Sequence, residues 1–440
     1  MKVWVQEIPT NRSYARVIEW SRLISITGFS QLLIQAVGLI GGILVIRLLP
    51  TTEYGWYTLA NTMLGTMIVL ADGGISTSVL AQGGKVWQSK EKLGRVLATG
   101  LYLRKKFAVA SILLAAPLLL YLLRHHDASW LTSIMILSAL VPAFFIALSS
   151  NLLTIAPSLH QAIIPLQKIS VGVSLARLMM LLLTLFFFPL AYIAIASASI
   201  PQIFGNIRLK RTTSAYADWH QKPDPAIQKE ILSVVKRILP GSIYYCLSGQ
   251  IIIWIISIFG TTAAVAQIGA LGRLSMVLSL FSAIFGTLIV PRFARLSNNK
   301  GLLLKRFIQL QLGLLILFTG IILLASIFPT QLLWILGKNY SGLEKELVLS
   351  IAGSCVSLLA GLLFTVSTSR NWAINPLISI PLTIAAIICG VLLLNVSSLV
   401  GVLTFSLFVS SVEVVMYFFY CIMKIKNVRI DANNTSSLQS

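Results

Sequence analysis

The feature that most constrains this chain is a series of long apolar stretches, each bounded by charges, turn residues or proline. A helix that crosses a bilayer needs about 20 apolar residues, and in lipid the backbone must satisfy its own hydrogen bonds. Each stretch therefore predicts one membrane-spanning helix. The twelve expected spans are 23–46, 57–80, 107–123, 130–153, 169–188, 190–207, 238–259, 263–290, 307–328, 347–369, 376–394 and 399–423.

The composition supports this interpretation. Of 440 residues, 57% are hydrophobic and 11% are charged, whereas a soluble protein carries about 25% charged residues. A water-soluble globular enzyme is therefore excluded. The expected fold class is an all-α polytopic membrane protein with about 12 transmembrane helices.

The distribution of basic residues predicts the orientation of the chain. Loops on one side of the expected membrane hold 28 Lys and Arg residues, and loops on the other side hold Arg47, Arg124, Lys338 and Lys345. Cytoplasmic loops carry the excess of basic residues, so both termini are expected in the cytoplasm. The net charge of +21 follows from this topology, and nucleic-acid binding is not expected.

The polar segment 208–237 divides the chain almost in half. It predicts an N-lobe over residues 1–207 with spans 1 to 6, a cytoplasmic connector over 208–237, a C-lobe over 238–423 with spans 7 to 12, and a cytoplasmic tail over 424–440. Two halves with the same even number of spans indicate parallel repeats about an axis normal to the membrane.

The sequence offers no catalytic constellation. The expected outward loops are short, the longest being 329–346, and there is no phosphate-binding glycine loop or metal-ligand motif. All four cysteines fall inside spans, where they are typical small apolar residues. Neither enzymatic activity, nor a cofactor, nor a metal site is expected. Arg104 and the four histidines, among them His125 and His126, are predicted to lie in solvated loops.

Four ionisable residues fall inside expected spans, where such groups are costly and usually face a bundle interior or a wet cavity. Arg177 and Arg273 lie about halfway along their spans and are expected to line a cavity. Asp72 and Glu413 either contribute to ion coupling or form ion pairs with the buried arginines. Weaker candidates for a polar lumen, equally explained by helix–helix hydrogen bonds, are Gln31, Gln35, Asn61, Gln250 and Gln267.

Several short motifs carry a resemblance to a known family. The segment Leu-Pro-Thr-Thr-Glu-Tyr-Gly-Trp-Tyr at 49–57 leads into a span that closes on Asp-Gly-Gly at 72–74. Val-Pro-Arg-Phe-Ala-Arg-Leu at 290–296 and Leu-Gly-Lys-Asn-Tyr at 336–340 follow in the second half. The chain resembles bacterial oligosaccharide flippases of the multidrug/oligosaccharidyl-lipid/polysaccharide (MOP) superfamily, most closely those of O-antigen or capsule repeat units. Gly73 departs from the family pattern, which has an apolar residue there.

The resemblance implies two six-helix lobes around a central cavity that opens alternately to either side of the bacterial inner membrane. The implied substrate is a polyprenyl-diphosphate-linked oligosaccharide, with membrane lipids and polysaccharide assembly proteins as further partners. Arginine donates paired hydrogen bonds and stays charged, so Arg177 and Arg273, one from each lobe, would provide a cationic site for the diphosphate.

Two alternatives remain open from the sequence. A cation-coupled drug or small-molecule antiporter of the same superfamily would share the architecture but use an acidic cavity, which Asp72 and Glu413 would fit. A membrane enzyme of lipid-linked sugars is the second alternative, and the short outward loops disfavour it. The two arginines favour an anionic substrate.

Overall fold

The computed structural model describes residues 12–278, 281–282, 285, 289–290, 293, 296, 299–370, 372 and 374–427; the side chains of 12–26, 237, 242, 245–249 and 376–377 are outside this description. The described residues form helices joined by short turns, with no strand among them. The helices of the first half are α1 (Arg12–Leu48), α2 (Thr51–Asp72), α3 (Ile75–Val86), α4 (Lys90–His125), α5 (Trp130–Leu153), α6 (Ile155–Leu159), α7 (Ile163–Phe187), α8 (Ala191–Ser214) and α9 (Pro225–Gly249). Those of the second half are α10 (Ile251–Phe259), α11 (Thr262–Ser275), η1 (Met276–Leu278), α14 (Lys300–Ile327), α15 (Pro329–Leu336), η3 (Lys338–Tyr340), α16 (Glu344–Ser369), α17 (Pro376–Leu393) and α18 (Leu399–Lys426).

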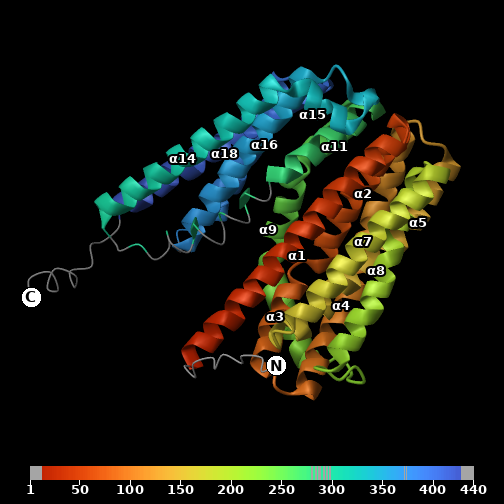
Figure 1. Ribbon diagram of the computed structural model, residues 1–440, viewed down its shortest axis with the longest axis vertical. Helices are drawn as coiled ribbons and strands as arrows, with labels where there is room; N and C mark the ends of the chain where they lie inside the picture. The colour runs from red at the N-terminus through yellow and green to blue at the C-terminus, as the bar shows by residue number, and fades with distance from the viewer. Residues whose placement is uncertain are drawn as a thin grey trace, which may run out of the picture. The chain divides into compact units, whose positions relative to one another are not determined.

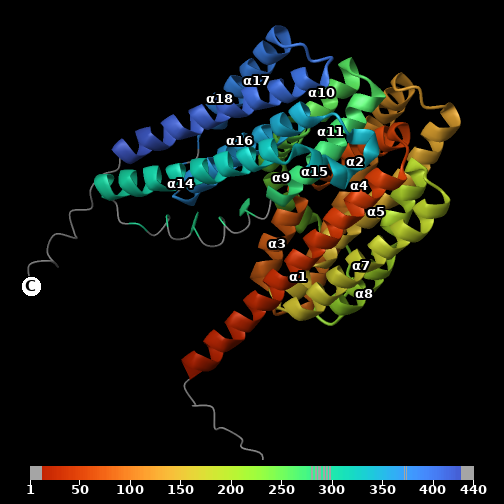
Figure 2. The same ribbon diagram turned by 45° about the horizontal axis from the view of Figure 1, so that its top comes forward.

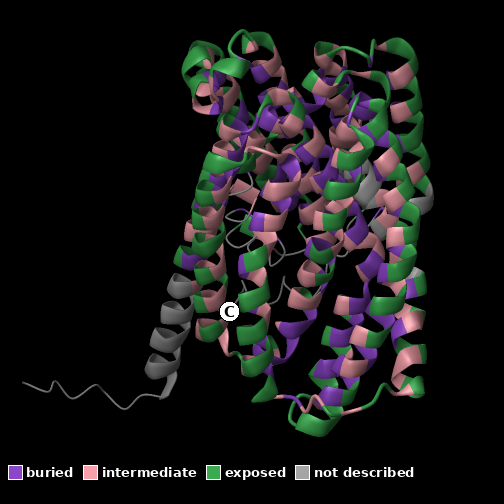
Figure 3. Cartoon of the chain, turned by 90° about the vertical axis from the view of Figure 1, so that its right-hand side faces the viewer, coloured by how far each residue is buried: buried purple, intermediate pink, exposed green. Residues whose placement is uncertain are grey.

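The predicted fold class is confirmed: the chain is an all-α polytopic protein. Each of the twelve expected spans coincides with helical residues, although most of 279–290 lies outside the described residues. Among the described residues, seven helices are long and apolar enough to cross a membrane, and α2 with α3 makes an eighth if the bent pair is one span. Large apolar side chains such as Phe186, Ile316 and Leu392 are more than 70% exposed. Figure 3 shows exposed residues alternating with buried ones along individual helices, as lipid-facing helices require.

The expected span 57–80 is broken between α2 and α3. The two helices meet at an angle of 43°, and the break is made by Gly73 (φ 49°) and Gly74 (φ 93°). Only glycine adopts such left-handed backbone angles without strain. The expectation of one continuous helix there is wrong for that reason. The expected span 238–259 is likewise divided between α9 and α10, at Gln250.

The chain packs into two compact units. Unit 1 contains the described part of Met1–Val45, with Met63–Leu118 and Leu131–Ile243. Unit 2 contains Ile46–Thr62, Leu119–Trp130 and the described part of Tyr244–Ser440. In unit 1, α7 and α8 run side by side (Figure 1); in unit 2, α16 packs against α18 and α14 (Figure 2). The helices α2 and α4 each run from one unit into the other.

The segment between α8 and α9 is a packed part of unit 1. The Asp218 amide donates to the Lys90 carbonyl oxygen at 3.0 Å, and the Asp224 amide donates to Thr99 Oγ1 at 2.9 Å. Gly94 makes room for this segment, since a Cβ there would lie 2.1 Å from the Asp218 oxygen. The first part of α9 adds Ile231 and Val235 to the apolar core of unit 1. This connection is therefore anchored to α4.

Candidate functional site

A large cavity lies within unit 2. Its volume is about 1030 Å³, and its walls come from the first half of α2 and from α10, α11, α16 and α18. Its polar lining consists mostly of hydroxyl and amide groups, namely Tyr54, Thr58, Asn61, Thr62, Gln250, Ser275, Ser282, Ser350, Ser354, Ser357, Thr365 and Ser406. Arg273 is the only basic residue of this lining, and the lining includes no acidic residue among the described residues.

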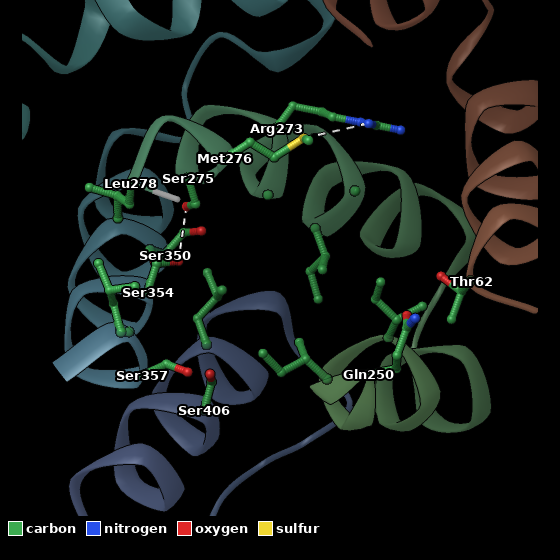
Figure 4. A pocket seen from close by; sticks show the side chains of 18 of the residues that line it. Thr62, Gln250, Arg273, Ser275, Met276, Leu278, Ser350, Ser354, Ser357 and Ser406 are labelled. Carbon is green, nitrogen blue, oxygen red and sulfur yellow. Dashed lines mark hydrogen bonds between the residues drawn. The ribbon is translucent and has the colours of Figure 1, made fainter. Parts of the chain in front are cut away.

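Figure 4 shows how these groups are distributed. Ser275, Ser350, Ser354, Ser357 and Ser406 follow one side of the cavity, and Thr62 and Gln250 lie across from them. Ser354 Oγ lies 2.9 Å from Ser275 Oγ and 2.8 Å from the Ser350 carbonyl oxygen. These hydroxyls donate and accept hydrogen bonds, so this side of the cavity suits a ligand that itself carries many hydroxyl groups.

Arg273 lies near the end of α11 and is held by neutral partners. The helix begins with Thr261, whose side chain accepts a hydrogen bond from the Ala264 amide at 3.2 Å. The Arg273 guanidinium forms side-chain hydrogen bonds with the Tyr54 and Tyr57 hydroxyls, and its Nη1 lies 3.6 Å from Met276 Sδ. No carboxylate pairs with it among the described residues. The positive charge is therefore available to an anionic ligand.

The start of α2 places Tyr54 against this arginine. Tyr54 is almost fully buried, with its ring 6.0 Å from that of Tyr57 and 6.5 Å, edge-on, from that of Tyr340. Two glycines let α2 and α11 approach closely. A Cβ on Gly55 would lie 2.8 Å from the Thr262 carbonyl oxygen, and one on Gly269 would lie 2.5 Å from Thr58 Oγ1.

A second, smaller cavity of about 190 Å³ in unit 2 contains Glu413. The other polar groups of its lining come mainly from hydroxyl side chains, among them Thr383, Ser410 and Tyr417. It shares Ser357 and several neighbouring residues with the larger cavity. No basic residue belongs to the described lining, so Glu413 does not share a cavity lining with Arg273.

Asp72 forms its ion pair within unit 1. Its carboxylate accepts hydrogen bonds from Arg104 Nη2 and from Ser76 Oγ, the latter at 2.7 Å. Arg104 Nη1 donates to the Leu148 carbonyl oxygen at 2.6 Å. The sequence predicts a solvated loop position for Arg104, which is wrong because α4 begins at Lys90 and buries this side chain to 2% exposure.

The remaining candidates fall in different places. Asn61 and Gln250 line the large cavity, whereas Gln267, half-buried on α11, is outside the described lining. Arg177 is exposed on α7 in unit 1. On α1, Gln31 is exposed and Gln35 is half-buried. Sequence reasoning did not single out the serines of α16, because hydroxyl residues are common in helices of any role, and it noted Tyr54 only as part of the 49–57 motif.

The prediction that His126 lies in a solvated loop is also wrong. It is 2% exposed and bonded on both ring nitrogens, with Nδ1 at 3.1 Å from Thr262 Oγ1 and Nε2 at 2.9 Å from the Ser257 carbonyl oxygen. Its own carbonyl oxygen accepts a hydrogen bond from Trp56 Nε1 at 3.0 Å. The loop after α4 is thereby fastened to α2, α10 and α11. The sequence alone gives no signal that separates His126 from its exposed neighbour His125. Only the packing shows which of the two is buried.

Burial lowers the pKa of His126 below its ordinary value of 6.5, which predicts an acid-sensitive stability. The unfolded chain takes up the proton first, so His126 contributes its full stability above about pH 6.5 and loses it as the pH falls toward the folded pKa. The thermal unfolding midpoint should therefore drop between pH 7.5 and 5.5, and His126→Gln should reduce that drop. His125→Gln, which changes the exposed neighbour, should keep it. Equal drops in both variants would contradict this role.

No protein-family model and no curated relative matches the sequence. Among solved structures, an inward-facing multidrug resistance MATE family transporter of the MOP superfamily matches with a TM-score of 0.68 and 14% identity, over 90% of this chain and 95% of that chain. The chain has the MATE-like transporter fold. An inward closed lipid II flippase MurJ matches with a TM-score of 0.67 and 14% identity, over 92% of this chain and 87% of that one. An outward-facing MATE transporter of the same superfamily matches with a TM-score of 0.62 and 15% identity, over 93% and 95%.

Proposed function

We propose that the protein is a flippase that moves a polyprenyl-diphosphate-linked oligosaccharide repeat unit across the bacterial cytoplasmic membrane. It works by alternating access and serves O-antigen or capsule assembly, with membrane lipids and polysaccharide assembly proteins as its partners. Both termini are cytoplasmic. The lobes are 1–207 and 238–423, joined by 208–237, and 424–440 forms the tail. The chain carries out transport and no covalent chemistry.

The observation that carries this proposal is the lining of the large cavity. It combines one arginine, no described carboxylate and a wall of serines. A guanidinium forms charge-assisted hydrogen bonds to phosphate oxygens, and hydroxyl groups match the hydroxyls of a sugar. A sugar diphosphate carries both features. MurJ, which shares the fold, is named as a flippase of another lipid-linked molecule.

A lipid-linked substrate also agrees with the volume of the cavity. About 1030 Å³ is at the upper end of ordinary small-molecule sites and accommodates a diphosphate with several sugar units. The polyprenyl chain has no need of a polar chamber, because it remains in the bilayer. Arg177 on α7 is the second proposed contact for the anionic part of the substrate, with Asn61 and Gln250 as hydrogen-bonding groups.

A second candidate function is a cation-coupled drug antiporter, which the MATE structures support equally at the level of the fold. The specific observation in its favour is Glu413, a carboxylate on the wall of the smaller cavity. Under the flippase proposal, Glu413 or Asp72 instead serves ion coupling. The charge of the large cavity favours an anionic cargo.

Reconstitution of the purified protein into liposomes separates the two functions. A fluorescent prenyl-diphosphate oligosaccharide should become accessible to an impermeant quencher several times faster than in protein-free liposomes. A fluorescent organic cation should show no protein-dependent movement under a proton or sodium gradient. Movement of the cation alone would overturn the flippase proposal in favour of the antiporter.

A further inference from the structure

We propose that Tyr54 and Tyr57 position the Arg273 guanidinium as a latch between α2 and α11, and that an anionic group binding Arg273 releases this latch. The proposal rests on the proposed function, from which it takes a diphosphate as the anion. Tyr54 and Tyr57 are positioning residues in this scheme, because they act on the substrate through Arg273.

A ligand in the cavity competes with Tyr54 and Tyr57 for the Arg273 guanidinium. The Arg273 guanidinium interacts with two neutral phenol hydroxyls, those of Tyr54 and Tyr57, and its Nη1 lies 3.6 Å from Met276 Sδ. A phosphate oxygen carries a negative charge, so it attracts the guanidinium through opposite charge as well as through hydrogen bonds, which a neutral phenol oxygen does not. A diphosphate in the cavity therefore displaces the tyrosines as the preferred partner.

The contacts between α2 and α11 differ in whether a ligand can reach them. The polar groups that join α2 and α11 include Arg273 and also His126, whose Nδ1 lies 3.1 Å from Thr262 Oγ1 and whose carbonyl oxygen accepts a hydrogen bond from Trp56 Nε1. Tyr54 and Arg273 line the large cavity, and His126 and Trp56 are outside its described lining. Of these two contacts, the Arg273 contact is therefore the one that a ligand in the cavity can reach.

The packing between α2 and α11 would loosen once the Arg273 bonds are lost. Near Gly55 and Gly269 the two helices touch through backbone, methyl and hydroxyl atoms at close range. A gap of about 0.5–1 Å removes about a quarter to a half of the dispersion energy at such contacts, so a small displacement of α2 weakens them substantially. Losing the Arg273 bonds therefore leaves a contact that resists separation less.

The helix α2 links this contact to the rest of the chain. Residues Ile46–Thr62 belong to unit 2, whereas Met63–Leu118 belong to unit 1, and α2 runs through this boundary as one helix. Release of the first half of α2 from α11 thus frees a segment of unit 2 that continues along the same helix into unit 1. Binding of the cargo and movement of the helix become one event.

A cysteine in place of Thr58 reports this release. Thr58 belongs to the cavity lining but is only 7% exposed because it faces Gly269, so a thiol there reacts faster when α2 leaves α11. The test uses the full chain in lipid nanodiscs, with the four native cysteines replaced by alanine, and measures the labelling rate with a polar maleimide. Farnesyl diphosphate is the anionic probe, and farnesol is its uncharged control.

The expected result has three parts. Farnesyl diphosphate should raise the labelling rate at least threefold, and farnesol should not. The double variant Tyr54→Phe/Tyr57→Phe should label at least threefold faster without any probe and should no longer respond to the diphosphate. Tyr340→Phe is the matched control, because Tyr340 belongs to the same aromatic cluster as Tyr54. Its buried hydroxyl has no hydrogen-bond partner among the described residues, so the variant should behave like the parent.

The labelling rates test the latch, whereas the transport assay in liposomes tests the proposed function. If the double variant and Tyr340→Phe both label at the parent rate, the latch is overturned even if the protein transports lipid-linked sugar. If the double variant labels quickly but farnesyl diphosphate leaves the parent unchanged, release by an anion is overturned. If the diphosphate accelerates labelling in a protein that moves no lipid-linked sugar in liposomes, the latch stands and the proposed function is rejected.

Discussion

Replacing Arg273 with alanine should lower transport of the lipid-linked substrate about 10- to 100-fold while leaving the amount of protein in the membrane near normal. Arg273 carries the only described positive charge of the cavity, and a hydrogen bond to a charged group contributes about 1.5–3 kcal/mol, or about one to two powers of ten in affinity. Its partners Tyr54 and Tyr57 are neutral, so no buried counter-charge is left behind. Arg273→Lys keeps the charge without the fork of donors and should retain partial activity.

The measurement is surface polysaccharide in a flippase-deficient strain, with protein quantified in isolated membranes. Arg177→Ala, in unit 1, should show a similar loss if both arginines contact the substrate. The matched control is Arg306→Ala, which removes an exposed arginine of unit 2 that is outside the cavity lining. Full activity of Arg273→Ala at normal abundance would reject the cationic site. Loss of the protein itself would instead indicate a structural role for Arg273.

Replacing Arg104 with alanine should reduce the amount of folded protein severely. Removal of one partner from a buried ion pair typically costs about 3–5 kcal/mol. The lower end of that range applies here because the Asp72 side chain is 24% exposed while that of Arg104 is 3% exposed. Such a loss is a large share of the stability of a typical domain. The level of the variant in membranes and its thermal unfolding midpoint should both fall clearly.

The chain provides a matched control on the same helix. Arg95 pairs with Glu91 one turn away, with both side chains about half exposed, and such surface pairs contribute less than about 1 kcal/mol. Arg95→Ala should therefore be close to the parent. The double variant Asp72→Asn/Arg104→Met removes both charges and should recover part of the lost stability. A normal level of Arg104→Ala would mean that the pair does not stabilise the α2–α3 bend.

The spans were predictable because lipid imposes one physical requirement on every residue within them. A stretch of about 20 apolar residues has to be helical, and no packing detail changes that. The breaks follow from local backbone chemistry instead. Gly73 and Gly74 adopt positive φ angles, and a glycine pair is a recognisable signal for a turn, although it does not say by how much the helix bends.

The cavity was only partly predictable. Arg273 stands out in the sequence because an arginine inside an apolar stretch needs an explanation. Arg104 does not stand out, because it lies among basic residues that cytoplasmic loops also contain. The serines along α16 and the buried His126 were missed for a related reason. Their residue types are ordinary, and only the packing of helices distant in sequence shows which of them line a cavity or join two helices.

The membership of α2 in both units has a consequence for how the protein is made. Its first half, up to Thr62, packs with residues from Tyr244 onward, which the ribosome adds much later. At about 5–20 residues per second, the interval between Thr62 and Thr262 is roughly 10 to 40 s. During that time Tyr54 and its neighbours are in the membrane without their final partners. Unit 1 is also incomplete until α9 supplies Ile231 and Val235. A ribosome that stalls near the middle of the message therefore leaves both units unfinished.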